Sequence, residues 1–207
     1  MHWKLNRPAL IAGAILLVGF LAWPMRGLAQ TTSASTITGQ GTAVQASVYS
    51  ILGTVTTALA DTGVIGTTNV AQDAGQVTGS VASLLNADVL SSSTYSYADE
   101  VDSLSSVGDL NLIVAGVSIT ANSVVAEASQ ALGAMGTGSS YVDGLAINGT
   151  PVALTGAANQ TIWIPGGQIA INERTISSTG AAVVNALHVT VTGVADVVVA
   201  MAKAGIS

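Results

Sequence analysis

Short runs in which apolar and polar residues alternate fill most of the chain, and Gly, Ser and Asn separate one run from the next. A period of two is typical of half-buried β-strands, and it is clearest in residues 182–192 and 195–202. Residues 44–59 have strand composition, although a helical stripe also fits from residue 49 onward. Beyond the N-terminal segment, no helical pattern of about ten residues stands out. The pattern therefore predicts an all-β protein.

Two β-hairpins are the strongest local predictions. The first spans residues 141–154 around Asn148-Gly149, the preferred residue pair for the two positive-φ positions of a tight hairpin turn. The second spans residues 160–172, with Pro165-Gly166-Gly167 as its turn. Because side chains alternate along a strand, Trp163 should point away from the isoleucines on either side of it.

These elements predict one antiparallel, β-sandwich-like domain of about eight to eleven short strands over residues 42–207. The Gly-rich residues 61–80 are expected to form loops or short strands. Residues 30–41 are small and polar, and we expect them to form a flexible leader or a strand donated to a neighbouring molecule.

Residues 1–29 predict a secretory signal peptide. Lys4 and Arg7 precede an apolar run over residues 9–23, and the small residues Gly27 and Ala29 suit cleavage after Ala29. This run is shorter than the roughly 20 residues that a spanning helix needs, and an uncleaved membrane anchor is the alternative. We therefore expect a secreted or cell-surface protein whose mature chain does not span a membrane.

Composition excludes several classes of function. The 207 residues include no Cys, which excludes disulfides, Cys-ligated zinc and a thiol nucleophile. Removal of the signal peptide leaves Arg174 and Lys203 against all 11 acidic residues, a net charge of −9, so we expect no nucleic-acid partner. Only 8% of residues are charged, so polar uncharged side chains must cover the surface and little charge density opposes self-contact.

Few side chains could carry chemistry, and we expect no catalytic residue and no cofactor. His188 is the one histidine after the signal peptide, but no G-x-S-x-G serine accompanies it, so we expect neighbouring groups to satisfy it structurally. Arg174 is expected to pair with a carboxylate. Calcium is the open alternative, because it takes carboxylate oxygens as ligands. Its candidate ligands are the acidic residues of one stretch, Asp99, Glu100, Asp102 and Asp109.

Three segments of the C-terminal half have a distinctive order and spacing. Residues 144–152 read GLAINGTPV, residues 185–189 read NALHV and residues 196–200 read DVVVA. Over residues 109–206, and more weakly back to residue 81, the chain resembles the bacterial choice-of-anchor P family. The resemblance implies an exported, β-rich surface domain without known catalysis, and it supplies no catalytic residues.

The sequence thus predicts a non-catalytic structural protein of the cell surface or extracellular matrix. It would self-associate into a fibre or layer, or bind other surface components, and addition of residues 30–48 to a neighbour's sheet is one mechanism. The alternative is a secreted glycan- or calcium-binding β-module that uses the loops near residues 99–109. An enzyme is a third hypothesis, which would depend on His188 or on paired carboxylates.

Overall fold

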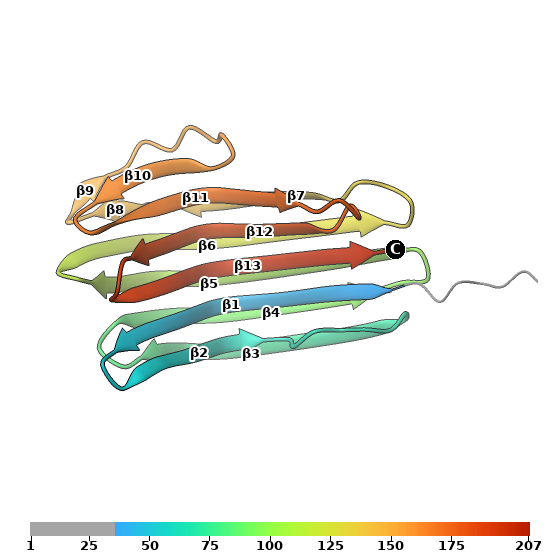
Figure 1. Ribbon diagram of the computed structural model, residues 1–207, viewed down its shortest axis with the longest axis horizontal. Coiled ribbons are helices and arrows are strands. Elements are labelled where there is room, and N and C mark those ends of the chain that lie inside the picture. The colour runs from blue at the N-terminus through green and yellow to red at the C-terminus, as the bar shows by residue number, and fades with distance from the viewer. Residues whose placement is uncertain (1–35) are drawn as a thin grey trace, which may run out of the picture. The chain divides into compact units, whose positions relative to one another are not determined.

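The computed structural model describes residues 36–207, which form two antiparallel β-sheets packed face to face (Figure 1). Sheet A has six strands, which follow one another in the order β10 (Gln160–Ile164), β11 (Gly167–Ile176), β12 (Ala182–Val191), β13 (Ala195–Ile206), β1 (Ile37–Ser50) and β2 (Gly53–Asp61). Sheet B has seven strands, in the order β3 (Val70–Val81), β4 (Leu85–Ser96), β5 (Glu100–Val114), β6 (Val117–Ala131), β8 (Ala146–Ile147) and β9 (Thr150–Pro151), with β7 (Thr137–Asp143) also paired to β6.

The β-sandwich prediction is confirmed, with more strands than expected. The 13 strands exceed the prediction because residues 44–59 fold back on themselves as β1 and β2, with Ile51 and Leu52 in the turn. The Gly-rich residues 61–80 also contribute most of the long strand β3. Among the residues that the structure describes, no helix is long and apolar enough to cross a membrane. The expected signal peptide and cleavage site lie outside these residues.

The chain winds through the two sheets and returns to its start. It crosses from β2 to β3, passes through sheet B strand by strand, crosses back to β10, and ends with β13 paired to β1. The described ends are paired as well: the Thr36 amide donates to the Ser207 carbonyl at 2.7 Å, and the Ser207 amide donates to the Thr36 carbonyl at 3.1 Å.

This path corrects the expectation for the end of the leader. Residues 37–41 belong to β1, which lies between β13 and β2 of the same chain. They are therefore neither a flexible leader nor a free strand in the folded monomer, because alternate residues of this segment, Ile37, Gly39 and Gly41, are buried, and both glycines lie against sheet B. A neighbouring molecule could receive β1 only after β1 had left its own sheet. Residues 30–35 lie outside the described part of the chain.

Both predicted hairpins form, although the first is shorter than expected. Asn148 and Gly149 have φ values of 50° and 76°, as a two-residue hairpin turn requires, and they join β8 to β9. The segment 141–147 does not form one continuous strand, because Gly144, at positive φ, interrupts strand pairing between β7 and β8. The second hairpin pairs β10 with β11, and Trp163 points outward as predicted.

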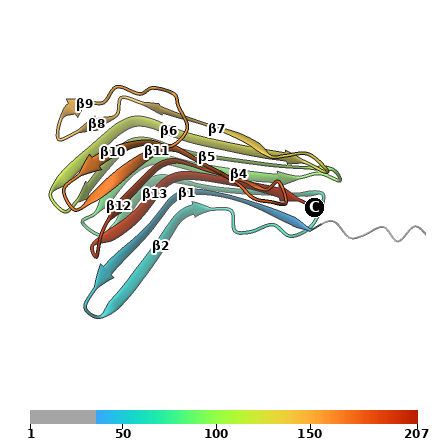
Figure 2. The same cartoon turned by 45° about the horizontal axis from the view of Figure 1, so that its top comes forward.

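In each sheet, a row of facing residues is left out of regular strand pairing, and the strands of both sheets bend (Figure 2). We call these residues the bulge row of the sheet. In sheet A, regular pairing skips one residue on every strand from β2 to β11, namely Ala60, Ala43, Ala200, Ala186 and Asn172. In sheet B, pairing skips Val77 opposite Val89 and Asp109 opposite Asn122. At the row, the inward-facing set of residues shifts by one position, which a strictly alternating strand does not allow.

The bulge rows divide the sandwich into two differently packed halves. The half away from the chain ends is filled by large aliphatic side chains such as Leu85, Leu112 and Leu187. The half near residues 36 and 207 contains more Gly, Ala, Ser and Thr, together with Val and Ile side chains such as Val101, Val184 and Ile206. There Ser103 Oγ donates to the Lys203 carbonyl at 2.7 Å and Ser105 Oγ to the Met201 carbonyl at 2.6 Å, so side chains of β5 bond directly to the backbone of β13 in the other sheet.

Candidate functional site

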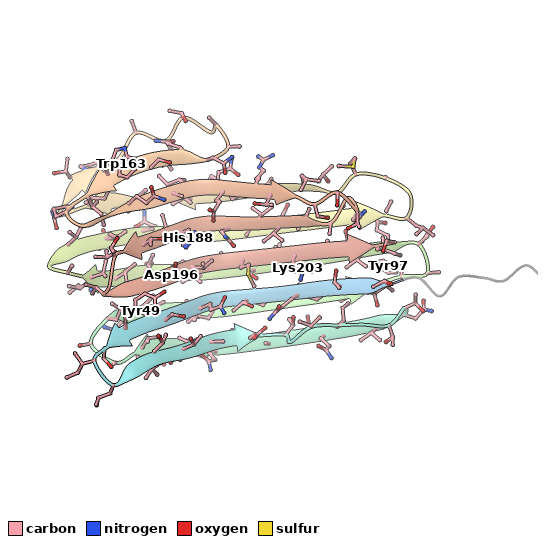
Figure 3. The ribbon with its side chains drawn as sticks, in the orientation of Figure 1. Tyr49, Tyr97, Trp163, His188, Asp196 and Lys203 are labelled. Carbon is pink, nitrogen blue, oxygen red and sulfur yellow. The ribbon has the colours of Figure 1, made fainter. Side chains whose placement is uncertain are left out.

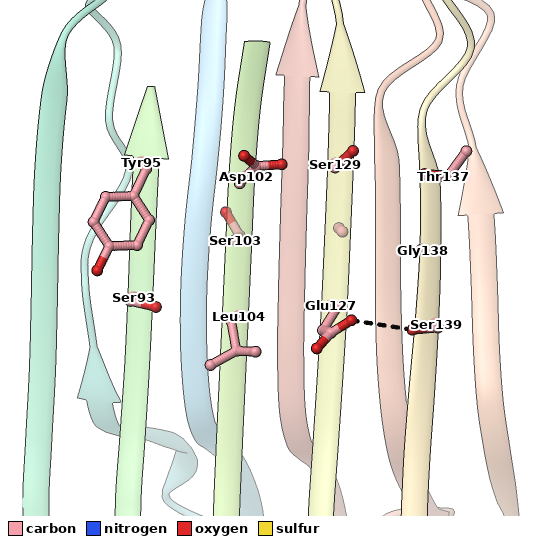
Figure 4. Close-up of a pocket in the computed structure, with 11 residues that line it drawn as sticks. Ser93, Tyr95, Asp102, Ser103, Leu104, Glu127, Ser129, Thr137, Gly138 and Ser139 are labelled. Carbon is pink, nitrogen blue, oxygen red and sulfur yellow. Dashed lines mark hydrogen bonds between the residues drawn. The ribbon is translucent and has the colours of Figure 1, made fainter. Parts of the chain in front are cut away.

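The candidate site is a groove of about 580 Å³ on the outer face of sheet B (Figure 4). Strand alternation turns one row of side chains outward from β4, β5, β6 and β7, and pairing aligns them as Tyr95, Asp102, Ser129 and Thr137. The next outward row is Ser93, Leu104, Glu127 and Ser139. These two rows form what we call the sheet-B groove, and it lies over the half of the sandwich that contains more small residues.

Tyr95 provides the aromatic surface of the groove. Figure 4 shows its ring lying flat on the sheet with one face turned outward. Its hydroxyl donates to Asp73 Oδ1 on β3 at 3.2 Å, which holds the ring in this orientation. The exposed fraction of Tyr95 is 37%, so the outward face of the ring is accessible.

One carboxylate, that of Asp102, stands beside the ring, and a second, that of Glu127, lies one strand further along the groove. Burial raises the pKa of Asp102 above its ordinary value, and a hydrogen bond from Ser129 partly opposes that shift. Glu127 lies diagonally across from Asp102 and accepts a hydrogen bond from Ser139 Oγ at 3.4 Å. None of the residues that line the groove is Lys or Arg. The groove therefore offers hydrogen-bond acceptors and hydroxyls but no positive charge.

The four calcium candidates do not come together. Asp102 lines the groove, whereas Asp99 and Glu100 lie where β4 turns into β5. Asp109 lies seven residues beyond Asp102 along β5, which corresponds to about 23 Å at the rise of a strand. No group of three or more His, Asp or Glu side chains within residues 36–207 could hold a metal ion. The structure thus brings only Asp102 of the four into the candidate site.

His188 lies in a separate polar cluster on the outer face of sheet A (Figure 3). Its Nδ1 is 2.8 Å from Glu173 Oε2 on β11, and its Nε2 is 3.2 Å from Asp196 Oδ1 on β13. Asn185 Nδ2 also donates to Glu173 Oε2, at 2.6 Å. Thr190 Oγ1 also lies 3.4 Å from Nε2. The ring thus has a carboxylate on each side and a hydroxyl beside it, which agrees with the prediction that neighbouring groups satisfy it.

Arg174 differs from the prediction. Its Nε donates to Asn172 Oδ1 at 3.0 Å, and within residues 36–207 the ion-pair contacts are those of His188. The side-chain carbonyl of Asn172 replaces the expected carboxylate because Asn172 sits at positive φ in the bulge row, two residues before Arg174.

Each sheet has two edge strands, β10 and β9 on one side of the sandwich and β2 and β3 on the other, and the sequence pattern did not reveal which strands these would be. We call β2 and β3, which lie together in Figure 1, the open side; each is an edge strand with no strand beyond it. Neither contains Lys, Arg or Pro. Val55 on β2 is 66% exposed and Val77 on β3 is 81% exposed, and in the adjoining turn the side chains of Ile51 and Leu52 are fully or almost fully exposed.

Comparisons of the whole chain with protein-family models, with curated proteins and with solved structures find no match. The site must therefore be interpreted from its own geometry.

Proposed function

We propose that this protein is a non-catalytic, exported structural protein of the cell surface or extracellular matrix, which self-associates into a fibre or layer. The contact that builds the assembly is the open side, where β2 and β3 receive a second copy of the chain. The open side itself is the observation that carries the proposal, because neither of its two adjacent edge strands contains a Lys, Arg or Pro that would block strand addition.

The side chains of the open side favour a protein partner. Val55, Val77, Ile51 and Leu52 are exposed aliphatic side chains on or next to the two edge strands, and exposed apolar surface favours protein association. The acidic side chains there are hydrogen-bonded within the chain: Asp61 Oδ1 accepts from Gln40 Nε2 at 2.9 Å, and Asp73 Oδ1 accepts from Tyr95. A second copy would thus meet backbone and apolar surface with few bare charges.

The rest of the molecule supports a structural role more than a catalytic one. His188 is held between two carboxylates, those of Glu173 and Asp196, which suits a structural polar cluster. The predicted signal peptide and the resemblance to the choice-of-anchor P family of exported surface domains support the location. The whole chain has only 5 Lys and Arg among 207 residues, so there are few lysines to place on edge strands as blocking charges.

Electron microscopy and light scattering of residues 30–207, which contain both sheets, test the proposal. We expect assemblies that grow with protein concentration. The double substitution Val55→Lys and Val77→Lys should leave the chain folded but monomeric, because a strand that joined either edge would have to cover a charge. The control is Ile113→Lys, which adds one lysine at an exposed position of β5, a strand with a partner on both sides; it should assemble like the wild type, and the single variants Val55→Lys and Val77→Lys, which match it in charge, should each weaken assembly.

Two results would contradict the proposal. One is a wild-type chain that stays monomeric at every concentration reached. The other is a doubly substituted chain that assembles as readily as the Ile113→Lys control, since the contact would then lie elsewhere.

A further inference from the structure

We infer that the sheet-B groove binds an uncharged polysaccharide chain. The ring of Tyr95 stacks on one sugar unit, and the carboxylates of Asp102 and Glu127 accept hydrogen bonds from hydroxyl groups along the polysaccharide. The groove lies on a sheet face and the open side lies on sheet edges, so this inference is independent of the proposed self-association.

The first argument is the orientation of Tyr95, which is already suited to a sugar ring before any ligand binds. A pyranose ring presents a face of C–H groups, which suits the negative face of an aromatic ring. Tyr95 is already flat on the sheet with one face outward, and its bond to Asp73 Oδ1 fixes the ring, so little conformational freedom is lost on binding (Figure 4). A tyrosine that served only to pack would direct that face into the protein.

The second argument is the set of polar groups that line the sheet-B groove together with Tyr95. Carboxylates accept only, and hydrogen bonds to them are stronger than those between neutral groups, so Asp102 and Glu127 are suited to ligand hydroxyls. Ser93, Ser129 and Ser139 add hydroxyls that both donate and accept. Leu104 supplies an apolar surface between them. A polyhydroxylated ligand with apolar ring faces matches all of these groups.

Charge excludes the other simple ligand classes. Two carboxylates without Lys or Arg among the lining residues would repel phosphate, sulfate or an acidic sugar. A metal ion lacks ligands, because no group of three suitable side chains exists within residues 36–207. A peptide strand would need a free sheet edge, whereas the groove lies across strands that are paired with one another.

The dimensions favour a chain over a single sugar. The groove crosses β4, β5, β6 and β7, which at the usual strand spacing covers about 14 Å. It is open along its length, so a long polymer can pass through without its ends being enclosed.

Calorimetric titration of residues 30–207 with three uncharged hexasaccharides tests the inference: cellohexaose, maltohexaose and the hexamer of N-acetylglucosamine. We expect at least one of them to bind, and a hexamer of galacturonic acid not to bind. Tyr95→Ala and Glu127→Gln should each weaken binding by about tenfold, as the loss of a stacking contact or of a charged acceptor implies.

The matched control is Tyr49→Ala, which removes a tyrosine of similar exposure, 40%, from sheet A and should leave binding unchanged. Thermal unfolding of each variant confirms that it folds. The inference is overturned if none of the three uncharged hexasaccharides binds. It is also overturned if Tyr95→Ala and Glu127→Gln bind as tightly as Tyr49→Ala, because the ligand would then lie elsewhere.

Discussion

Val89 is a β-branched residue held at a φ of 51°, and it marks the bulge row of sheet B. A residue with a Cβ is strained by about 1–2 kcal/mol in this region, whereas Asn tolerates it. Because Val89 is largely exposed, Val89→Asn should raise the free energy of unfolding by about 1 kcal/mol and the melting temperature by about 2–4 °C. Calorimetry would measure the change.

Val77 provides the control for this substitution, because it stands opposite Val89 in the same bulge row without a positive φ. Val77→Asn should be neutral or slightly destabilising, since Asn is a weak strand former. If Val89→Asn proved no more stable than Val77→Asn, the strain assigned to Val89 would be absent.

Asp102 should make stability depend on pH in an unusual direction for a carboxylate. Burial raises its pKa in the folded state above the value of 3.8 that it has when exposed, so folding disfavours the charged form. The penalty is present at pH values above the folded-state pKa and disappears as pH falls below 3.8. Asp102→Asn should therefore raise the melting temperature at pH 7, and the gain should vanish near pH 3.

Asp88→Asn gives the matching loss of charge at an exposed position of β4, and it separates the local effect from that of net charge. Melting curves of the two variants between pH 3 and pH 7 would decide. An increase in melting temperature for Asp102→Asn that stayed constant between pH 3 and pH 7 would contradict a raised pKa of Asp102 in the folded state.

For single residues, the sequence predicted which way some side chains point but not which residues lie beside them. Alternation correctly placed Trp163 opposite its neighbouring isoleucines, and His188 is satisfied by neighbouring groups as expected. It could not show that Asp102 would face Glu127, because that depends on the register of the β5–β6 hairpin. The sequence analysis also grouped Asp109 with Asp102 as calcium ligands. The two residues lie far apart because both belong to the same extended strand, β5.

At the scale of elements, β1 depends on Gly41 where the two sheets approach closely. A Cβ at this position would lie 2.7 Å from the Leu104 carbonyl oxygen and 3.1 Å from Ser105 Oγ, in the half of the sandwich that contains more small residues. Gly41→Ala should destabilise the fold by about 1–3 kcal/mol, because β1 or β5 must shift. Chemical denaturation would measure the loss.

Gly75→Ala is the control, since a Cβ there would lie 3.6 Å from its nearest neighbour, the Leu90 carbonyl oxygen, on an exposed edge strand. It should change stability by less than about 1 kcal/mol. Equal losses for the two variants would show that close sheet packing is not the cause.

Elements with a marked turn were predictable, and elements without one were not. Asn148-Gly149 and Pro165-Gly166-Gly167 carry their turn conformation in their own residue types, so both hairpins could be located. The turn at Ile51-Leu52 consists of aliphatic residues, so nothing in the pattern separated β1 from β2. Residues 61–80 were expected to form only loops or short strands, and the length of β3 was not predicted because it is an edge strand with little buried surface, whose Gly and Gln residues are typical of loops.

At the scale of the whole molecule, two surfaces have different properties. The open side presents uncharged backbone edges and aliphatic side chains, whereas the sheet-B groove presents acceptors on a face that remains free when edges pair. The sequence supplied the class of fold and the shortage of charge. Neither surface could be read from it, because both are created by which strands end up at the edge and which rows align across the sheet.

The pairing of β1 with β13 also has a consequence for how the chain reaches this structure. Strand β1, the first of the described strands to be synthesised, needs β13, the last of them, as its neighbour in sheet A. Pairing the two must overcome the loss of chain entropy when segments distant in sequence are brought together. Proteins with such long-range pairing fold slowly. Until β13 arrives, β1 has unsatisfied hydrogen-bonding groups along one edge. Crowding by other newly made chains during that interval would decide whether each molecule closes on itself or exchanges its first strand with a neighbour.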